Sequence, residues 1–241
     1  MFGFKVQRRR RSKDEGEKPF WISFSDLMTA LMVLFLVAMA VALMAVTQGL
    51  QQIKQTQEQR DKTIAACLSD VEAIANLPEF MGVKVHGNSI DFGTLVQFKD
   101  KEHTFEKPTD ERLIRRFIPK VLEVARAQQC KEWLKRVVVE GFASNTGDYL
   151  YNLNLSYLRS QRVLCALLKA QASDALTESD RSQIQSLFLV GGSSFNTAAS
   201  DGAARMRRVE IKLEFRDIGS EPEAPPVIPL DPGLRCPNDL R

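Results

Sequence analysis

The sequence is poor in the residues that bind metals or form nucleophilic catalytic sets. Histidine occurs only twice, at His86 and His103, and neither has an obvious catalytic partner. The glycine-rich segment at residues 191–194 has no following lysine, which a phosphate-binding loop would require. The four cysteines are not spaced like metal ligands: Cys67, Cys130, Cys165 and Cys236. These absences leave no basis for a conventional enzyme, and we expect no cofactor and no metal.

The sequence also has only one long apolar run, at residues 19–46, which is long enough to cross a bilayer. Seven basic residues precede it: Lys5, Arg8, Arg9, Arg10, Arg11, Lys13 and Lys18. Basic residues beside a span stay in the cytoplasm, so we expect the N-terminus inside and everything after Val46 outside. The location of these basic residues favours membrane topology and contact with anionic lipid over binding of nucleic acid.

A cleaved signal peptide is the competing interpretation of this run. The run is longer than the usual apolar core of a signal peptide, and residues 42–46 form a poor cleavage site. We therefore expect a retained helix and a single-pass membrane protein.

One charged residue, Asp26, interrupts the apolar run. A charged side chain in a bilayer costs at least a few kcal/mol, so it tends to face protein or a water path and to have a function. Asp26 lies roughly 9 Å along the helix from Phe20, at about 1.5 Å of rise per residue. Helical spacing puts five residues on its face: Ile22, Ser23, Thr29, Ala30 and Val33. Ser25 lies at the edge of that face.

Five regions are predicted along the chain: a basic tail (1–18), a transmembrane helix (19–46), a helical linker (47–78), an α/β domain (79–217) and a proline-rich tail (218–241). The linker has an approximate heptad pattern, which is compatible either with a parallel helical pair, with Cys67 on its seam, or with a solvated helix. The tail is expected to be extended and held through Cys236. Four cysteines allow three intrachain pairings, and the sequence does not choose among them.

Within the α/β domain, alternating and helical apolar patterns predict strands and helices, and the family resemblance described below implies that they form a mixed sheet with packed helices. The expected strands are residues 83–85, 89–92, 137–142, 186–191 and 208–215. The expected helices are residues 110–127 and 153–170. Thr109 is the predicted cap of the first helix, and Pro119 is predicted to kink or split it.

The segment around Asp26 closely resembles the N-terminus of the B subunits of ion-driven stators, such as flagellar MotB. The shared residues are Trp21, Asp26 and the pair Thr29-Ala30. The resemblance implies that Asp26 carries the transported ion, with Ser25 and Thr29 supporting its path. A bare carboxylate with few other oxygen ligands favours H⁺, and Na⁺ is the alternative. Without the motif, Asp26 would be read as a capping or interfacial carboxylate.

A second set of motifs resembles OmpA-like peptidoglycan-binding domains, across most of the α/β region. It comprises a turn at residues 141–148, a following Tyr-Asn pair, a Leu-Ser-x-x-Arg helix and an Arg-Arg pair at residues 207–208. The resemblance implies a groove that binds the peptide stem of the cell wall, with Arg159 on a carboxylate of diaminopimelate. The implied binding residues are Ser144, Tyr151, Asn152, Leu155 and Arg159.

Two positions depart from that family's pattern. Ser144 stands where the family has an aspartate, so the ion pair to the amine of diaminopimelate is lost, and Met206 replaces an asparagine. An OmpA-like fold that no longer binds wall, with Arg159 as a surface charge, is therefore the alternative.

A carboxylate on one spanning helix, joined to a wall-binding domain, indicates an anchored transducer. By resemblance, its partners are a multi-span MotA-like A subunit that forms a pentamer around a dimer of this chain, a second copy of the chain, and peptidoglycan. Compact length, cysteines and a proline-rich tail make the chain look most like the B components of the Zorya antiphage-defence system, which act on cytosolic effectors indirectly through the A subunit. The resemblance implies the bacterial inner membrane. A flagellar stator subunit and a passive wall tether without ion flux are the alternatives.

Overall fold

The computed structural model describes residues 17–144, 147–170, 173–194, 207–220 and 236. The basic tail, Met206 and most of the proline-rich tail lie outside the described residues. The chain divides into two units, residues 1–56 and 57–241, which are treated separately below.

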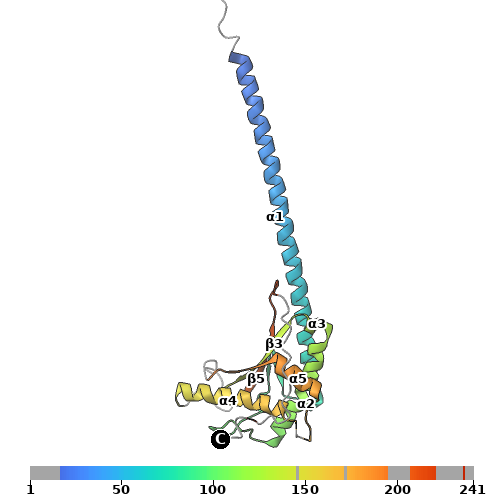
Figure 1. Cartoon of the computed structure of the whole chain (residues 1–241), viewed down its shortest axis with the longest axis vertical. Coiled ribbons are helices and arrows are strands. Elements are labelled where there is room, and N and C mark those ends of the chain that lie inside the picture. Colours follow the sequence, from blue (N-terminus) through green and yellow to red (C-terminus); the bar gives the residue numbers. More distant parts are fainter. Residues whose placement is uncertain (1–16, 145–146, 171–172, 195–206, 221–235, 237–241) are drawn as a thin grey trace, which may run out of the picture. The chain divides into compact units, whose positions relative to one another are not determined.

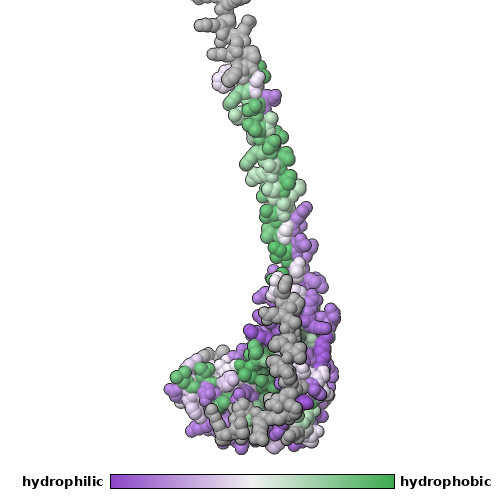
Figure 2. All heavy atoms as spheres, viewed as in Figure 1, coloured by the Kyte–Doolittle hydropathy of each residue, from purple (hydrophilic) through white to green (hydrophobic). Residues whose placement is uncertain are grey.

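Helix α1 (Glu17–Ala75) contains the whole predicted span (Figure 1). It runs without interruption because no proline follows Pro19 until Pro78, and Gly49 is its one glycine. From Trp21 to Val46 its large apolar side chains are exposed, and Figure 2 shows them as a continuous apolar surface. By length and composition, α1 qualifies as a membrane-spanning helix.

The last part of α1 belongs to the second unit. Cys67, Val71 and Ala75 are 2%, 1% and 3% exposed, and Val71 and Ala75 join the core of that unit. Their spacing of four residues places them on one face of the helix. The sequence pattern left open a paired helix or a solvated linker, and the structure instead packs this face against the chain's own domain.

The second unit is built on a five-stranded sheet in the order β1-β2-β5-β3-β4. Its strands are β1 (Lys84–His86), β2 (Ser89–Asp91), β3 (Leu134–Gly141), β4 (Phe188–Gly192) and β5 (Val209–Phe215). Strands β3 and β4 pair in parallel, and the other neighbours pair antiparallel. The predicted mixed sheet is confirmed.

Helices α2 (Pro108–Arg126), α3 (Gln128–Lys131), α4 (Tyr149–Leu168) and α5 (Glu178–Leu187), with the short 3-10 helix η2 (Pro78–Phe80), complete the unit (Figure 1). Apolar side chains of α2, α4 and the sheet form one buried cluster. Val137 and Val139 contribute from β3 because alternate strand residues face the same side.

Three local predictions were wrong. Pro119 does not split α2 in two: the helix continues through it, with buried residues such as Phe117 and Val121 on both sides. Lys107 rather than Thr109 is the N-cap residue, and it makes no side-chain capping bond. The expected strand at residues 186–191 begins at Phe188, since residues 186 and 187 end α5, a helix that the sequence analysis missed.

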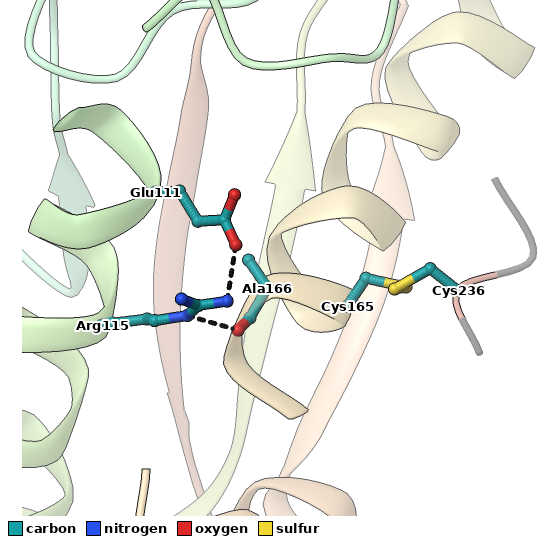
Figure 3. Close-up of a disulfide and its surroundings, with 5 residues drawn as sticks. All are labelled: Glu111, Arg115, Cys165, Ala166 and Cys236. Carbon is teal, nitrogen blue, oxygen red and sulfur yellow. Dashed lines mark hydrogen bonds and ion pairs between the residues drawn. A yellow bond between two sulfur atoms is a disulfide. The ribbon is translucent and has the colours of Figure 1, made fainter. Parts of the chain in front are cut away.

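Two disulfides connect distant segments. Cys67 of α1 bonds to Cys130 of α3, and Cys165 of α4 bonds to Cys236, which is the predicted attachment of the tail (Figure 3). Beside the second disulfide, Arg115 of α2 donates from Nε to the carbonyl of Ala166 at 2.8 Å. This bond holds the end of α4 against α2.

Helix α4 approaches the sheet closely at two glycines. A Cβ atom at Gly141 of β3 would lie 2.0 Å from the carbonyl oxygen of Ser156, and one at Gly192 of β4 would lie 2.7 Å from the amide of Tyr157. Neither backbone atom can move without moving the helix. At neighbouring Gly191 the nearest atom would be 4.0 Å away.

We expect Gly141→Ala to lower the thermal unfolding midpoint of the purified full chain by roughly 5 °C or more, because overpacking typically costs ~1–3 kcal/mol. Gly191→Ala is the matched control and should leave the midpoint nearly unchanged. Thermal unfolding is monitored by fluorescence and circular dichroism. Equal unfolding midpoints for the two variants would contradict the close packing of α4 on β3.

Candidate functional site

The first candidate site lies on α1, in the first unit. Asp26 and six residues toward the C-terminus line a shallow groove on the helix surface: Thr29, Ala30, Val33, Leu34, Val37 and Ala38. Thr29, Ala30 and Val33 were predicted on this face. Of the other predicted neighbours, Ile22 and Ser23 do not line the groove.

Ser25 and Thr29 interact with each other rather than with the Asp26 carboxylate. The hydroxyl of Thr29 donates to the carbonyl oxygen of Ser25 at 2.7 Å. Thr29 lines the groove, whereas Ser25 is not part of its lining. Asp26 and Thr29 are therefore the two polar residues in the lining of this groove, and the other lining residues are apolar.

The second candidate site is a pocket of about 450 Å³ in the second unit. It brings together all five residues that the sequence motifs marked: Ser144, Tyr151, Asn152, Leu155 and Arg159. Asp100, Lys101 and Gly147 complete its lining.

The start of α4 sets the position of four of these residues. Gly147 has a φ of 97°, which favours glycine, and Asp148 caps the helix by accepting from the amides of Leu150 at 2.8 Å and Tyr151 at 3.2 Å. The cap starts α4 at Tyr149 instead of the predicted residue 153. Tyr151, Leu155 and Arg159 then recur at four-residue intervals and face the same pocket.

Arg159 is 1% exposed, so it is not the surface charge of the alternative interpretation. Its guanidinium donates to three carbonyl oxygens: Phe142 at 2.9 Å, Glu102 at 3.1 Å and Lys99 at 3.3 Å. Its Cζ also lies 5.5 Å from the ring centre of Phe98. The side chain thus joins α4 to the end of β3 and to the turn at residues 99–102.

The charge of Arg159 dominates the inner part of the pocket. Burial, followed by the nearby positive charge of Arg207, lowers the pKa of Arg159 to about 10, while Asp100 opposes the shift. The group therefore stays protonated at neutral pH. Within the described residues, no carboxylate forms an ion pair with it.

The remaining hydrogen-bonding capacity of Arg159 suits an anion. A guanidinium has one N–H on Nε and two on each terminal nitrogen. The three carbonyls use Nε and one N–H of each terminal nitrogen. One N–H remains on each terminal nitrogen, and a guanidinium can donate two N–H groups to one carboxylate.

The predicted Arg-Arg pair lies beside this pocket. Arg207 pairs with Asp100 at 3.5 Å, and Arg208 pairs with Glu210 at 2.8 Å while its Cζ lies 4.5 Å from the ring centre of Phe142. Arg208 thus contacts the ring of Phe142, the residue whose carbonyl oxygen accepts a hydrogen bond from Arg159.

Sequence reasoning missed Asp100 and Lys101. Both come from the turn between Phe98 and Phe105, about fifty residues before α4 in the chain. No spacing relates this turn to the helix. One signal was present, a dense run of charged residues between two phenylalanines.

Comparisons with known proteins match the N-terminal part of the chain to a family and almost the whole chain to a relative. Residues 6–58 match the family described as membrane MotB of the proton-channel complex MotA/MotB. The Zorya protein ZorB of Escherichia coli O139:H28 is 39% identical over 237 residues, which cover 95% of this chain and 96% of that protein.

Solved structures match part of the chain at low identity. The periplasmic domain of Helicobacter pylori MotB matches with a TM-score of 0.39 and 14% identity, over 56% of this chain and 79% of that one. The OmpA-like domain of FopA1 from Francisella tularensis matches with a TM-score of 0.36 and 15% identity, over 59% and 90%.

An apolar span with one carboxylate, its match to membrane MotB and the mixed-sheet domain that follows are together those of a stator-like B subunit. Within that class, the near full-length match identifies the particular family: the chain belongs to the ZorB family.

We expect Arg159→Ala to destabilise the second unit by about 3 kcal/mol or more, because three carbonyl oxygens lose their donor and a cavity remains. Arg112→Ala removes an exposed arginine of α2 and should stay within about 0.5 kcal/mol of the wild type. Urea unfolding of the purified full chain, followed by tryptophan fluorescence, measures both. A difference below about 1 kcal/mol between them would contradict the three-carbonyl contact.

Proposed function

We propose that this chain is the wall-anchored B subunit of an ion-driven membrane motor that acts in antiphage defence. Asp26 takes up and releases the transported ion, and the pocket around Arg159 binds peptidoglycan. The observation that carries this proposal is the single carboxylate in the exposed and otherwise apolar part of α1 at residues 19–46. Such a group is costly in lipid, so it needs a protein or water path around it.

A lone helix cannot enclose an ion path. The proposed partner is a multi-span MotA-like A subunit, arranged as a pentamer around a dimer of this chain, and the matched family's description as part of a MotA/MotB complex supports a partner of this kind. The apolar groove below Asp26 offers small residues, Ala30 and Ala38, against which other helices can pack closely. Cytosolic defence effectors would receive the signal through the A subunit.

The chemistry of the groove favours H⁺ as the ion. Asp26 and the Thr29 oxygen are the polar groups that line it. A proton needs one carboxylate oxygen, whereas a metal cation needs several oxygen ligands, which the partner subunit would have to supply for Na⁺.

The proposed location is the bacterial inner membrane, with the N-terminus in the cytoplasm and the second unit in the periplasm. The basic residues before the span support this orientation. The two disulfides support it independently, because disulfides persist in oxidising compartments.

Wall binding is proposed from the pocket chemistry and the OmpA-like motifs. A buried guanidinium with two N–H groups remaining suits a peptide carboxylate, such as that of diaminopimelate, and Tyr151, Asn152 and Leu155 form the adjoining wall. A passive tether would use the same pocket without ion flux, and a flagellar stator would use both sites to drive a rotor.

In cells that carry the native operon, we expect Asp26→Asn to abolish protection against phage, because the neutral amide cannot carry a proton. Glu58→Gln makes the same charge change on an exposed part of α1 beyond the apolar run and should protect like the wild type. Plaque counts at matched membrane levels measure the effect.

Full protection by Asp26→Asn would exclude the ion-carrier role and leave the passive tether. No protection by the wild-type operon, with a swimming defect on deletion, would instead indicate a flagellar stator.

We expect the wild-type chain, purified in detergent, to sediment with isolated peptidoglycan. Arg159→Lys keeps the charge but lacks the planar guanidinium fork, so its binding should fall by roughly tenfold. Arg112→Lys is the matched control. Sedimentation of Arg159→Lys at wild-type levels would contradict the assignment of Arg159 to the wall carboxylate.

A further inference from the structure

The two disulfides follow the order of the cysteines in the sequence. Cys67 bonds to Cys130, and Cys165 bonds to Cys236, so the first cysteine pairs with the second and the third with the fourth. Four cysteines allow three pairings, and this is the one in which the first bond can close before the third cysteine is needed. The two cysteines closest in sequence, Cys130 and Cys165, do not pair with each other.

All four cysteines are shielded in the folded second unit. Cys130 is 0% exposed, Cys67 2%, Cys165 6% and Cys236 7%. Thiol–disulfide exchange requires a thiolate to attack a disulfide sulfur directly, so a second protein has to reach the sulfur atom. Once the unit has folded, neither an oxidising enzyme nor an isomerase can do so. The bonds therefore have to be made correctly before they are buried.

The proposed topology delivers the cysteines to the oxidising side of the membrane one after another. With the N-terminus inside and the chain outside after Val46, Cys67 crosses first. A thiol held in a mixed disulfide is released when another thiol of the chain attacks it. Cys130 is the next to arrive and can release Cys67. Cys165 and Cys236 then repeat the sequence, which gives the two pairs that the structure contains.

The first disulfide can close before the sheet forms. Strand β5 lies between β2 and β3, and its residues 209–215 follow both Cys130 and Cys165 in the chain. Until β5 has crossed the membrane, β3 lacks its antiparallel neighbour. Arg216, whose carbonyl accepts from Nε of Arg60 at 2.9 Å, follows later still. Cys67 and Cys130 are therefore accessible to an enzyme on a chain that has not yet folded.

We propose that this chain is a substrate of a periplasmic dithiol oxidase, a thiol–disulfide oxidoreductase with a reducible disulfide, which oxidises it twice in chain order during export. On this mechanism the chain needs no disulfide isomerase. Cys67 and Cys165 attack the oxidase, and Cys130 and Cys236 release it. The inference rests on the proposed periplasmic location of the second unit and adds the class of enzyme that completes it.

Each oxidation consists of two exchange steps. The thiolate of Cys67 attacks one sulfur of the oxidase disulfide, so a mixed disulfide forms and the oxidase keeps one thiolate. The thiolate of Cys130 then attacks the sulfur of Cys67, which forms the structural disulfide and expels the second oxidase thiolate. Two electrons pass to the oxidase, and the protons of the two cysteine thiols are balanced by those taken up by its dithiol.

The experiment expresses the full chain with its native operon in three otherwise identical bacterial hosts: a wild type, one without its periplasmic dithiol oxidase and one without its disulfide isomerase. Acid quenching and a thiol-reactive polyethylene glycol reagent count free cysteines on a gel, and mass spectrometry of unreduced peptides identifies the pairs. Both disulfides should form fully in the wild-type and isomerase-deficient hosts. Most chains should keep free thiols in the oxidase-deficient host.

A cysteine variant separates pairing by chain order from pairing selected by the fold. In Cys67→Ser, chain order has Cys165 release Cys130, whereas the fold selects the Cys165–Cys236 bond. In the isomerase-deficient host we expect the Cys130–Cys165 bond and a free Cys236. The matched control is Cys236→Ser, in which both mechanisms leave the Cys67–Cys130 bond unchanged.

The outcomes are distinct. Non-native pairs in the isomerase-deficient host, or a Cys165–Cys236 bond in Cys67→Ser there, would overturn oxidation in chain order. Complete oxidation in the oxidase-deficient host would overturn the requirement for the enzyme. Four free thiols in the wild-type host, together with resistance of the second unit to protease added outside spheroplasts, would instead refute the proposed periplasmic location.

Discussion

The second unit depends on the contact between the Arg159 guanidinium and three carbonyl oxygens. These carbonyls belong to Phe142, Lys99 and Glu102, which lie on different segments. A buried cation is tolerated only with such partners, so α4, the end of β3 and the turn at residues 99–102 must keep one arrangement. The close approach of α4 to Gly141 and Gly192 brings the arginine to that depth.

The same contact links stability to binding. The carbonyls offset part of the desolvation cost of the guanidinium but carry no net negative charge, so they do not neutralise Arg159. A ligand carboxylate can then use the N–H groups that remain. A structural arginine and a binding arginine are therefore not alternatives here, and the wall-binding proposal requires both roles from one side chain.

The two units differ in where their apolar side chains lie. In the first unit, apolar side chains from Trp21 to Val46 are exposed, which requires lipid or other helices around them. In the second unit, the end of α1 buries Val71 and Ala75 in the domain core, and Cys67 is bonded to Cys130. The helix that carries Asp26 thus continues into the domain without an intervening loop. A covalent bond, the Cys67–Cys130 disulfide, fixes the end of the helix to α3.

The sequence by itself determined the apolar span and its isolated carboxylate, which follow from local composition. The mixed sheet and five of the pocket residues were predicted from motifs that the chain shares with OmpA-like domains. Only the tertiary structure decided the disulfide pairing, the packing of residues 67–75 onto the domain, the continuity of α2 through Pro119 and the presence of Asp100 in the pocket. Each of these depends on which distant segments meet. An apolar stripe indicates that the helix packs against another segment, and a cysteine that it can form a disulfide. Only the tertiary structure shows which segment or which cysteine is the partner.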